Sequence, residues 1–385
     1  MEANKRCAMV ITGALCLGGG IAGVNRLALH SFQDAGFGVE VFSLLESAAL
    51  QNDRFMDSTQ LVYRVFHGQK VRFISHVWRS VLTRNYDHVY VDHVNLSALL
   101  APLGALGLCH YSVWLFGIES WPPRPGISGA CGARMACKRL SISDFTARKF
   151  AERFPHLSVQ ICELALDPVL HDPVRELLLD IDNDPLVLSA ISGTSYPLGR
   201  AMILHVARMN ASERYKGQDV LIQAMPEILA EHPHSQLVLV GSGDDKPRLL
   251  ELAVSMPEAV RQAVFFPGFV SDAQLDRLYR QCAVFAMPSR GEGFGLTYIE
   301  AMARGKPCVG GRQDAAQCVI RHGQTGLLVD DPTDTQEVAE AIRQLLSNPV
   351  SAREMGRAGY CLVQERYLYP HFRSRFLKCL GLENP

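Results

Sequence analysis

The chain has 385 residues, which is enough for two domains of ordinary size, each with its own hydrophobic core. Hydrophobic residues make up 48% and charged residues 20%, a globular composition that excludes an intrinsically disordered chain. The formal net charge of −1 provides no overall positive field, so nucleic acid is not an expected partner and an anionic ligand must be held by a local site.

Eleven cysteines are spread along the sequence without a C-x-x-C pair or the spacing of zinc ligands. Such an odd, unpatterned set is typical of the reducing cytoplasm, which is the location we expect. Five of these thiols have apolar or small neighbours, which favours inert buried cysteines over a catalytic one: Cys7, Cys109, Cys137, Cys282 and Cys308.

The first residues allow two interpretations. Lys5 and Arg6, followed by an apolar run, resemble a secretory signal, but residues 8–15 also form the pattern of a buried strand. The strand is favoured because a glycine loop and an amphipathic helix follow it in a coherent strand-loop-helix order. No apolar run reaches the ~20 residues that a membrane-spanning helix needs.

Strand and helix patterns alternate in both halves of the sequence. In the first half the expected strands are 8–15, 39–44, 88–91 and 112–116, and the first helix is 21–35. In the second half the expected strands are 201–207, 236–240, 264–266, 283–287 and 307–309, with helices at 217–231, 272–281 and 296–303. This alternation predicts an α/β fold of two doubly wound, Rossmann-like domains, residues 1–180 and 200–366, facing each other across a ligand-binding cleft. Turn-rich residues 181–199 are the expected linker.

Two cations follow the strand that ends near residue 207. Arg208 stands at the carboxyl end of this strand, and Lys216 stands just before the next helix. Together they can bind a diphosphate, because arginine supplies bidentate donors, lysine a compact charge, and the helix N-terminus amide donors. The alternative is a solvated basic loop, and Arg214 between them is expected to be solvated.

Two carboxylates flank a second glycine-rich loop. Glu292 precedes the predicted helix that begins near Leu296, and Glu300 lies about one turn inside it. The glycines around Phe294, including Gly295, let the backbone approach a ligand closely. Two carboxylates seven residues apart can accept hydrogen bonds from hydroxyls at opposite ends of a nucleotide sugar, which favours binding over a surface position for both.

A third glycine loop, which contains Gly19 and Gly20, follows the first strand. Nicotinamide-binding folds have the same feature, so it is a weak signal. A nicotinamide site also needs an acidic residue at the end of the second strand, whereas Glu40 lies at the beginning of it. An oxidoreductase is therefore the weakest interpretation.

The second half resembles the retaining nucleotide-sugar glycosyltransferases of family 4, which have the GT-B fold. The resemblance covers most of residues 200–345 and rests on an ordered set of motifs: Val206-Ala207-Arg208, Arg214-Tyr215-Lys216-Gly217, Leu239-Val240-Gly241-Ser242-Gly243, Pro267-Gly268-Phe269-Val270, and Glu292 to Glu300 with Ala301-Met302-Ala303-Arg304-Gly305-Lys306-Pro307. The first half matches more loosely, through its glycine loop and helix.

The resemblance implies a role for each motif. Arg208 and Lys216 would hold the donor diphosphate, Glu300 the ribose hydroxyls, and Glu292 the transferred sugar. The backbone amides of Phe294, Gly295 and Leu296 would lie near that sugar, Phe269 and Val270 would lie against the base, and Gly19 and Gly20 would approach the phosphates. The C-terminal segment 367–385 would pack back on the first domain.

One position departs from the family pattern. Many members carry a histidine near the reacting sugar, in a His-Gly-x-Glu setting, whereas this sequence has Phe116-Gly117-Ile118-Glu119. His93 is an alternative candidate for the catalytic histidine, although a lone loop histidine is often structural. Asp92 and Glu119 are further candidates for contacts to the acceptor.

The resemblance also implies catalysis without a metal or other cofactor. Asp182-Asn183-Asp184 does fit the Asp-x-Asp motif of metal-dependent transferases, but its place in the predicted linker favours an acidic connector. Residues 69–84 combine cations with apolar residues, and this helix is either an ordinary surface helix or a peripheral contact with the cytoplasmic face of a membrane.

We therefore expect a hexosyltransferase that uses a UDP- or GDP-sugar and a glycan, lipid-linked or small-molecule acceptor, in the synthesis of cell-surface polysaccharides or glycoconjugates. A nucleotide-sugar epimerase of the same fold and a non-catalytic nucleotide-sugar binding protein stay open as alternatives.

Overall fold

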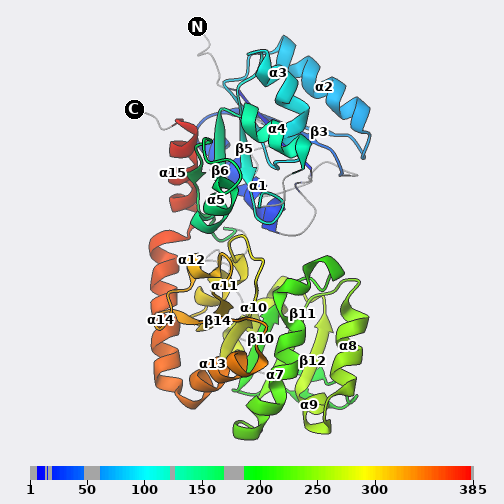
Figure 1. Cartoon of the computed structure of the whole chain (residues 1–385), viewed down its shortest axis with the longest axis vertical. Coiled ribbons are helices and arrows are strands. Elements are labelled where there is room, and N and C mark those ends of the chain that lie inside the picture. The colour runs from blue at the N-terminus through cyan, green and yellow to red at the C-terminus, as the bar shows by residue number, and fades with distance from the viewer. Residues whose placement is uncertain are drawn as a thin grey trace. The chain divides into compact units, whose positions relative to one another are not determined.

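A computed structural model describes residues 7–13, 15, 20–46, 61–121, 126–168 and 186–382 of the chain. It divides into two compact units, one formed by Met1–Val169 with Leu368–Pro385 and the other by Leu170–Tyr367 (Figure 1). Each unit is built around its own parallel sheet, as the alternating pattern predicted. Among the described residues, no helix combines the length and apolar character needed to cross a bilayer.

The sheet of the first unit has the strand order β3-β2-β1-β4-β5-β6-β7, with parallel pairing throughout the described strands. Its strands are β1 (Cys7–Thr12), β2 (Gly38–Ser43), β3 (Leu61–Val65), β4 (His88–Val91), β5 (Tyr111–Leu115), β6 (Lys138–Ser141) and β7 (Gln160–Ile161). Its helices are α1 (Gly20–Asp34), α2 (Lys70–Thr83), η1 (Leu96–Leu100), α3 (Ala101–Ala105), α4 (Ile127–Met135), α5 (Asp144–Ala151) and α15 (Tyr369–Leu380).

The sheet of the second unit has the order β12-β11-β10-β13-β14-β15, again with parallel pairs. Its strands are β10 (Met202–Val206), β11 (Gln236–Val240), β12 (Val264–Gly268), β13 (Val284–Met287), β14 (Cys308–Gly311) and β15 (Gly326–Val329). The helical segments are η2 (Ala211–Lys216), α7 (Gln218–Glu231), α8 (Lys246–Ser255), α9 (Glu258–Ala263), α10 (Asp272–Gln281), α11 (Leu296–Met302), α12 (Ala316–Val319), α13 (Thr335–Ser347) and α14 (Pro349–Arg366).

Burial explains why the strands of the second unit are almost continuously apolar. All four residues of β13 and all four of β14 are buried, because helices cover both faces of the sheet. Side chains of β10, β11 and β13 share one core with α7 and α13, through residues such as Ile203, Leu237, Val284, Ile222 and Ile342. This core fixes the strands, and their carboxyl ends then present the loops that carry the predicted site.

The strand order also marks where a ligand is expected. In the second unit the chain runs outward from β10 to β12 in one direction, and then crosses to β13 on the other side of β10. In open α/β sheets, ligands bind beyond the carboxyl ends of the strands at such a switch point. The loops after β10 and β13 carry the predicted cations and the glycine-rich acidic motif, respectively.

Residues 186–199 fall within the expected linker and form an antiparallel hairpin of β8 (Val187–Ser189) and β9 (Ser195–Pro197). An isolated bridge joins Ala190 to Phe265 of β12, and the ring of Tyr196 contacts the ring of Phe265 edge-on. This part of the chain is therefore held against the second unit.

The C-terminal helix α15 belongs to the first unit, where it packs against α1 (Figure 1). The ring of Phe376 lies 5.3 Å from that of Phe32 and stacks on Trp114 of β5. The hydroxyl of Tyr369 donates to Asp34 at 2.6 Å. The aromatic contacts bury one face of α15 and so fix the last helix to the N-terminal sheet.

Candidate functional site

Lys216 and Glu292 meet in the second unit, although 76 positions separate them in the sequence. The Nζ atom of Lys216 lies 3.4 Å from Oε2 of Glu292, and the two side chains are only 15% and 19% exposed. Lys216 ends η2, after β10, whereas Glu292 stands in the loop after β13. The two neighbouring strands of the switch point therefore bring a cation and a carboxylate into direct contact.

Gly217 explains how the two loops approach so closely. It adopts a left-handed conformation, with φ 78°, between η2 and α7. A Cβ atom at this position would lie 2.5 Å from the carbonyl oxygen of Pro288, which follows β13. The backbone N–H of Arg290 also donates to the carbonyl of Tyr215 at 3.1 Å. Only glycine permits this contact, which places Lys216 beside the acidic loop.

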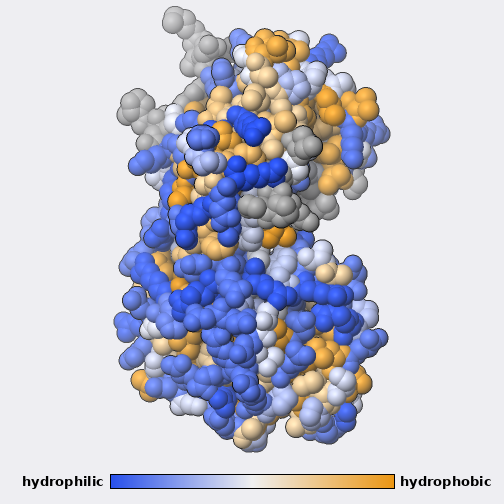
Figure 2. All heavy atoms as spheres, viewed as in Figure 1, coloured by the Kyte–Doolittle hydropathy of each residue, from blue (hydrophilic) through white to orange (hydrophobic). Residues whose placement is uncertain are grey.

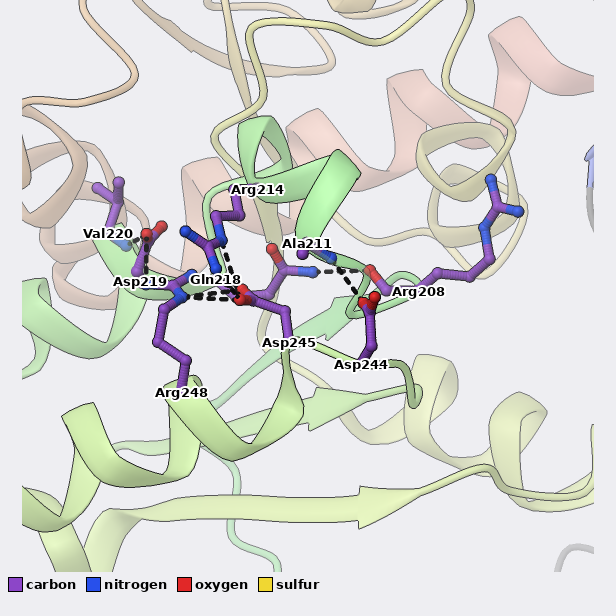
Figure 3. Close-up of polar contacts among 9 residues, drawn as sticks. All are labelled: Arg208, Ala211, Arg214, Gln218, Asp219, Val220, Asp244, Asp245 and Arg248. Atoms are coloured by element: carbon purple, nitrogen blue, oxygen red, sulfur yellow. Dashed lines mark hydrogen bonds and ion pairs between the residues drawn. The ribbon is translucent and has the colours of Figure 1, made fainter.

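Arg208 follows β10, and its guanidinium group has a carboxylate partner of its own. Its Nη2 atom pairs with Glu213, and its side chain is 64% exposed. The side-chain amide of Gln218 donates to the carbonyl oxygen of Arg208 at 3.1 Å, which fixes the backbone of this residue. In Figure 3 the Arg208 side chain extends away from Arg214 and Arg248.

Two adjacent carboxylates hold the segment between the two predicted cations (Figure 3). Asp244 accepts from the backbone N–H of Ala211 at 2.7 Å. Asp245 accepts from Arg214 at 2.9 Å and from Nη2 of Arg248 at 2.6 Å. The hydrogen bond from Arg248, followed by that from Arg214, holds the pKa of Asp245 below its usual value. The predicted solvation of Arg214 is confirmed, since its side chain is 51% exposed, and the structure adds an ion pair with Asp245, 31 positions away.

The acidic loop is anchored by Asp314, a residue that the sequence analysis missed. Asp314 is fully buried, and its Oδ2 atom accepts from the backbone N–H of Glu292 at 2.7 Å. The N–H of Ala315 donates back to the carbonyl oxygen of Glu292 at 3.0 Å. Burial is the main reason that the pKa of Asp314 is raised to about 7. The one available signal was its place after β14, the next strand of the sheet.

The segment between the two glutamates consists largely of backbone and core. Gly295 has φ 100° and precedes α11, and an added Cβ atom would collide with the ring of Tyr298. Phe294 is 2% exposed and its ring packs edge-on against Tyr367, so its side chain belongs to the core. Phe294 and Gly295 can therefore offer a ligand mainly their main-chain groups, whereas the side chain of Leu296 is partly exposed.

Glu300 and the loop after β12 complete the predicted donor site. Glu300 is partly exposed on α11, and its Oε2 atom accepts from the hydroxyl of Tyr279 at 2.8 Å. Phe269 is 88% exposed directly after β12, and Val270 beside it is half-buried. Both side chains stand beyond the carboxyl edge of the same sheet.

The predicted first-unit residues are held mainly by local contacts. Gly20 is exposed at the start of α1, whereas Gly19 lies outside the described residues, as do Asp182, Asn183 and Asp184. His93 follows β4, and its Nδ1 atom accepts from the backbone N–H of Asn95 at 3.1 Å. This contact assigns the proton of the neutral ring to Nε2.

Asp92 and Glu119 also have structural partners. Asp92 is buried and accepts from the hydroxyl of Thr12, the N–H of Gly13 and the amide of Asn25. Burial raises the pKa of Asp92. Glu119 accepts from the N–H groups of Phe116 and Gly117, both at 2.8 Å. Within the part of the chain that the structure describes, no group of three or more His, Cys, Asp or Glu side chains is arranged to hold a metal ion.

Residues 200–348 match the family model described as "Glycosyl transferases group 1". The GDP-mannose-dependent monoacylated alpha-(1-6)-phosphatidylinositol monomannoside mannosyltransferase of Corynebacterium glutamicum is 33% identical over 175 residues, which are 44% of each chain. The GDP-mannose-dependent alpha-(1-6)-phosphatidylinositol monomannoside mannosyltransferase of Mycobacterium tuberculosis is 31% identical over 227 residues, 57% of this chain and 54% of the relative. The chain thus spans about half the length of these curated relatives.

Solved structures match over nearly the whole chain. Anabaena HepE in complex with UDP-glucose superposes with a TM-score of 0.71 at 18% identity, covering 97% of this chain and 99% of HepE. The sucrose-phosphate synthase of Thermosynechococcus elongatus has a TM-score of 0.73 at 19% identity, covering 98% of both chains. At this identity the matches concern the fold, and they confirm the predicted pair of Rossmann-like halves. Residues 200–348 of this chain are thus similar to the glycosyl transferases group 1 family, consistent with the predicted family 4 assignment, and the chain has the GT-B fold.

Proposed function

We propose that the chain is a retaining glycosyltransferase that transfers a hexose from a UDP- or GDP-sugar to a glycan, lipid-linked or small-molecule acceptor. The observation that carries the proposal is the contact of Lys216 with Glu292 at the switch point of the second sheet. A cation for the diphosphate and a carboxylate for the sugar lie side by side there. The bond that breaks joins these two parts of the donor, so a site that cleaves it needs both groups close together.

The names of the relatives support the same proposal. Two of them are GDP-mannose-dependent enzymes that act on a phosphatidylinositol mannoside, and the HepE structure holds UDP-glucose. A lipid-linked acceptor and a role in cell-surface glycoconjugate synthesis are therefore the acceptor class and the setting that we favour.

The chemistry assigned to each residue follows from its charge and position. Arg208 and Lys216 neutralise the diphosphate as the bond between the anomeric carbon and the phosphate oxygen breaks. The acceptor oxygen forms the new bond on the same face of the sugar, and its proton passes to an oxygen of the leaving phosphate. Glu292 accepts hydrogen bonds from hydroxyls of the transferred sugar, and Glu300 from the ribose. We propose that no metal or other cofactor is needed, because the two cations perform the neutralisation.

His93 is the proposed contact from the first unit. Because its Nδ1 atom accepts from Asn95, the neutral ring has its proton on Nε2 and can donate it to a sugar oxygen. His93→Ala is expected to lower kcat, whereas His93→Asn, which keeps a donor, is expected to retain more of it.

Binding of the donor is tested by thermal shift with UDP, GDP, UDP-glucose and GDP-mannose. A ligand at a hundred times its Kd stabilises the folded protein by about 2.7 kcal/mol, a clear rise in Tm. Lys216→Ala is expected to abolish most of this rise, whereas Lys149→Ala, a lysine of α5 in the first unit that pairs with Glu152, is the matched control. A purified chain whose Tm responds to none of these nucleotides would refute the proposal.

The proposed peripheral association with a membrane rests on α2. This helix contains no acidic residue, and the cations Lys70, Arg72 and Arg79 are all exposed. Val71 is 84% exposed and Leu82 is 55% exposed on the same helix. Figure 2 shows apolar and hydrophilic side chains together over α2, at the upper right of the view. Such a mixture is typical of a helix that lies at an anionic interface.

Vesicle co-sedimentation tests the association. We expect the protein to bind vesicles that contain phosphatidylglycerol and to remain free of phosphatidylcholine vesicles. The change Arg72→Glu with Arg79→Glu is expected to abolish binding, while Arg353→Glu, an exposed cation of α14, is expected to have no effect. Binding that is insensitive to anionic lipid would exclude this part of the proposal.

A further inference from the structure

Tyr279 lies on α10, 21 positions before Glu300, and the fold brings its hydroxyl to the carboxylate. The hydroxyl donates to Oε2 of Glu300 at 2.8 Å. Tyr279 itself is only 2% exposed, whereas Glu300 is partly exposed to solvent. A buried donor thus holds a carboxylate that is partly accessible to solvent.

The ring of Tyr279 is fixed on two sides. It packs against the ring of Phe285 of β13 at 5.8 Å, and the guanidinium of Arg304 lies 6.0 Å from its centroid. Burial raises the pKa of Tyr279 well above its ordinary value, so the hydroxyl keeps its proton and remains a donor throughout the physiological range. The direction of this hydrogen bond is therefore set by packing and does not change with pH.

The two helices that carry this contact are also tied to each other. Asp276 of α10 accepts from Arg304, in the turn directly after α11, at 2.7 Å and from Arg280 at 2.6 Å. A capping box of Ser271 and Gln274 fixes the start of α10. Residues 276, 279 and 280 lie on one face of α10, because residues three and four apart share a face. This face thus holds both Glu300, near the end of α11, and Arg304, in the turn that follows the helix.

We propose that Tyr279 is a positioning residue that orients the Glu300 carboxylate for the ribose hydroxyls of the donor. The inference rests on the proposed function and adds to it a residue that determines how strongly the ribose is recognised. A free glutamate side chain loses up to ~2 kcal/mol of rotamer entropy when a ligand orders it. The hydrogen bond from Tyr279 restricts the Glu300 side chain before the donor binds, so less rotamer entropy is lost on binding. The ordered carboxylate then accepts hydrogen bonds from the ribose hydroxyls in a fixed geometry.

The test compares nucleotides with and without ribose hydroxyls. Isothermal titration would measure Kd for UDP and GDP and for their 2′-deoxy and 3′-deoxy forms, with the wild type and with Tyr279→Phe. A hydrogen bond to a charged group is worth ~1.5–3 kcal/mol, so in the wild type the loss of the contacted hydroxyl should weaken binding roughly ten- to hundredfold. In Tyr279→Phe this penalty should shrink at least about threefold, because a mobile carboxylate discriminates less.

A second comparison separates orientation from general damage. The change Glu300→Ala removes the group through which Tyr279 acts, so adding Tyr279→Phe to it should cause no further loss of affinity. Tyr111→Phe is the matched control, because it removes a buried hydroxyl that donates to the backbone carbonyl of Gly132 in the first unit. It should leave the deoxynucleotide penalty at the wild-type value.

The outcomes distinguish this inference from the function on which it rests. If the wild type binds neither nucleotide, both fail. If the wild type binds and Tyr279→Phe has the same deoxynucleotide penalty, or lowers affinity equally with and without Glu300, only the positioning role of Tyr279 is overturned. A reduced penalty together with no further loss in the double variant supports it.

Discussion

Replacement of Gly217 by alanine tests how the switch-point loops are held together. Two costs are expected. A non-glycine residue in the left-handed region at φ 78° costs ~1–2 kcal/mol. The new Cβ atom would also lie 2.5 Å from the carbonyl oxygen of Pro288 and 2.8 Å from its Cγ atom, so the backbone must shift, and such overpacking typically costs about 1–3 kcal/mol more. The total is therefore about 2–5 kcal/mol of unfolding free energy.

Gly305 provides the matched control. It also has a positive φ, 67°, but an added Cβ atom would meet nothing within 4 Å. Gly305→Ala should therefore cost only the conformational part, about 1–2 kcal/mol. Urea denaturation of both variants gives the difference, and thermal shift with nucleotide diphosphate shows whether displaced Lys216 still binds. Equal unfolding free energies for the two variants would refute the argument that contact with Pro288 requires glycine.

Three further predictions concern the site. Arg208→Ala is expected to lower turnover about tenfold or more, since a hydrogen bond to a charged group is worth ~1.5–3 kcal/mol, and it should leave the melting temperature nearly unchanged because this side chain is 64% exposed. Dialysis against EDTA is expected to leave donor turnover intact, and activity that returns only on addition of a divalent cation would contradict the metal-free mechanism. The pKa of Asp314 is about 7 in the folded chain against 3.8 as its ordinary value, so between these pH values the folded chain binds a proton that the unfolded chain has lost. The free energy of unfolding of the wild type, relative to that of Asp314→Asn, should therefore fall as the pH rises from 4 to 7, by at most ~1.4 kcal/mol per pH unit. Urea titrations at several pH values measure this fall.

Local patterns predicted the elements of the second unit and the residues at their ends. Arg208, Lys216 and Glu292 follow buried strands, and glycine motifs mark the turns, so each position was visible within a short stretch of sequence. The family resemblance assigned Lys216 and Glu292 to one donor site, and the contact between their side chains became visible only in the structure.

Residues that act through partners distant in the sequence escaped the sequence analysis. Asp314 anchors Glu292 from 22 positions away, and Tyr279 holds Glu300 from 21 positions away. Arg214 forms an ion pair with Asp245 across 31 positions. A hydrogen-bond partner on another element leaves no periodic signal, because it depends on how the strands are ordered and packed.

The contact between Lys216 and Glu292 predicts that a diphosphate and the Glu292 carboxylate compete for the lysine. Both side chains are largely shielded from water. A diphosphate must displace this carboxylate from Lys216, while the same carboxylate is then available to the sugar. Glu292→Gln removes the competing charge, so free UDP or GDP should bind several-fold more tightly, even though turnover falls because the sugar loses its acceptor.

Titration calorimetry and donor turnover measure the two effects separately. Glu213→Gln is the control, since it removes the carboxylate that pairs with Arg208. Because the Arg208 side chain is 64% exposed, water already screens its charge, so nucleotide affinity should change by less than about twofold. If Glu292→Gln instead weakens the binding of nucleoside diphosphate, the carboxylate does not compete for Lys216. The pair would then be a structural contact, and the diphosphate would have to bind elsewhere on the chain.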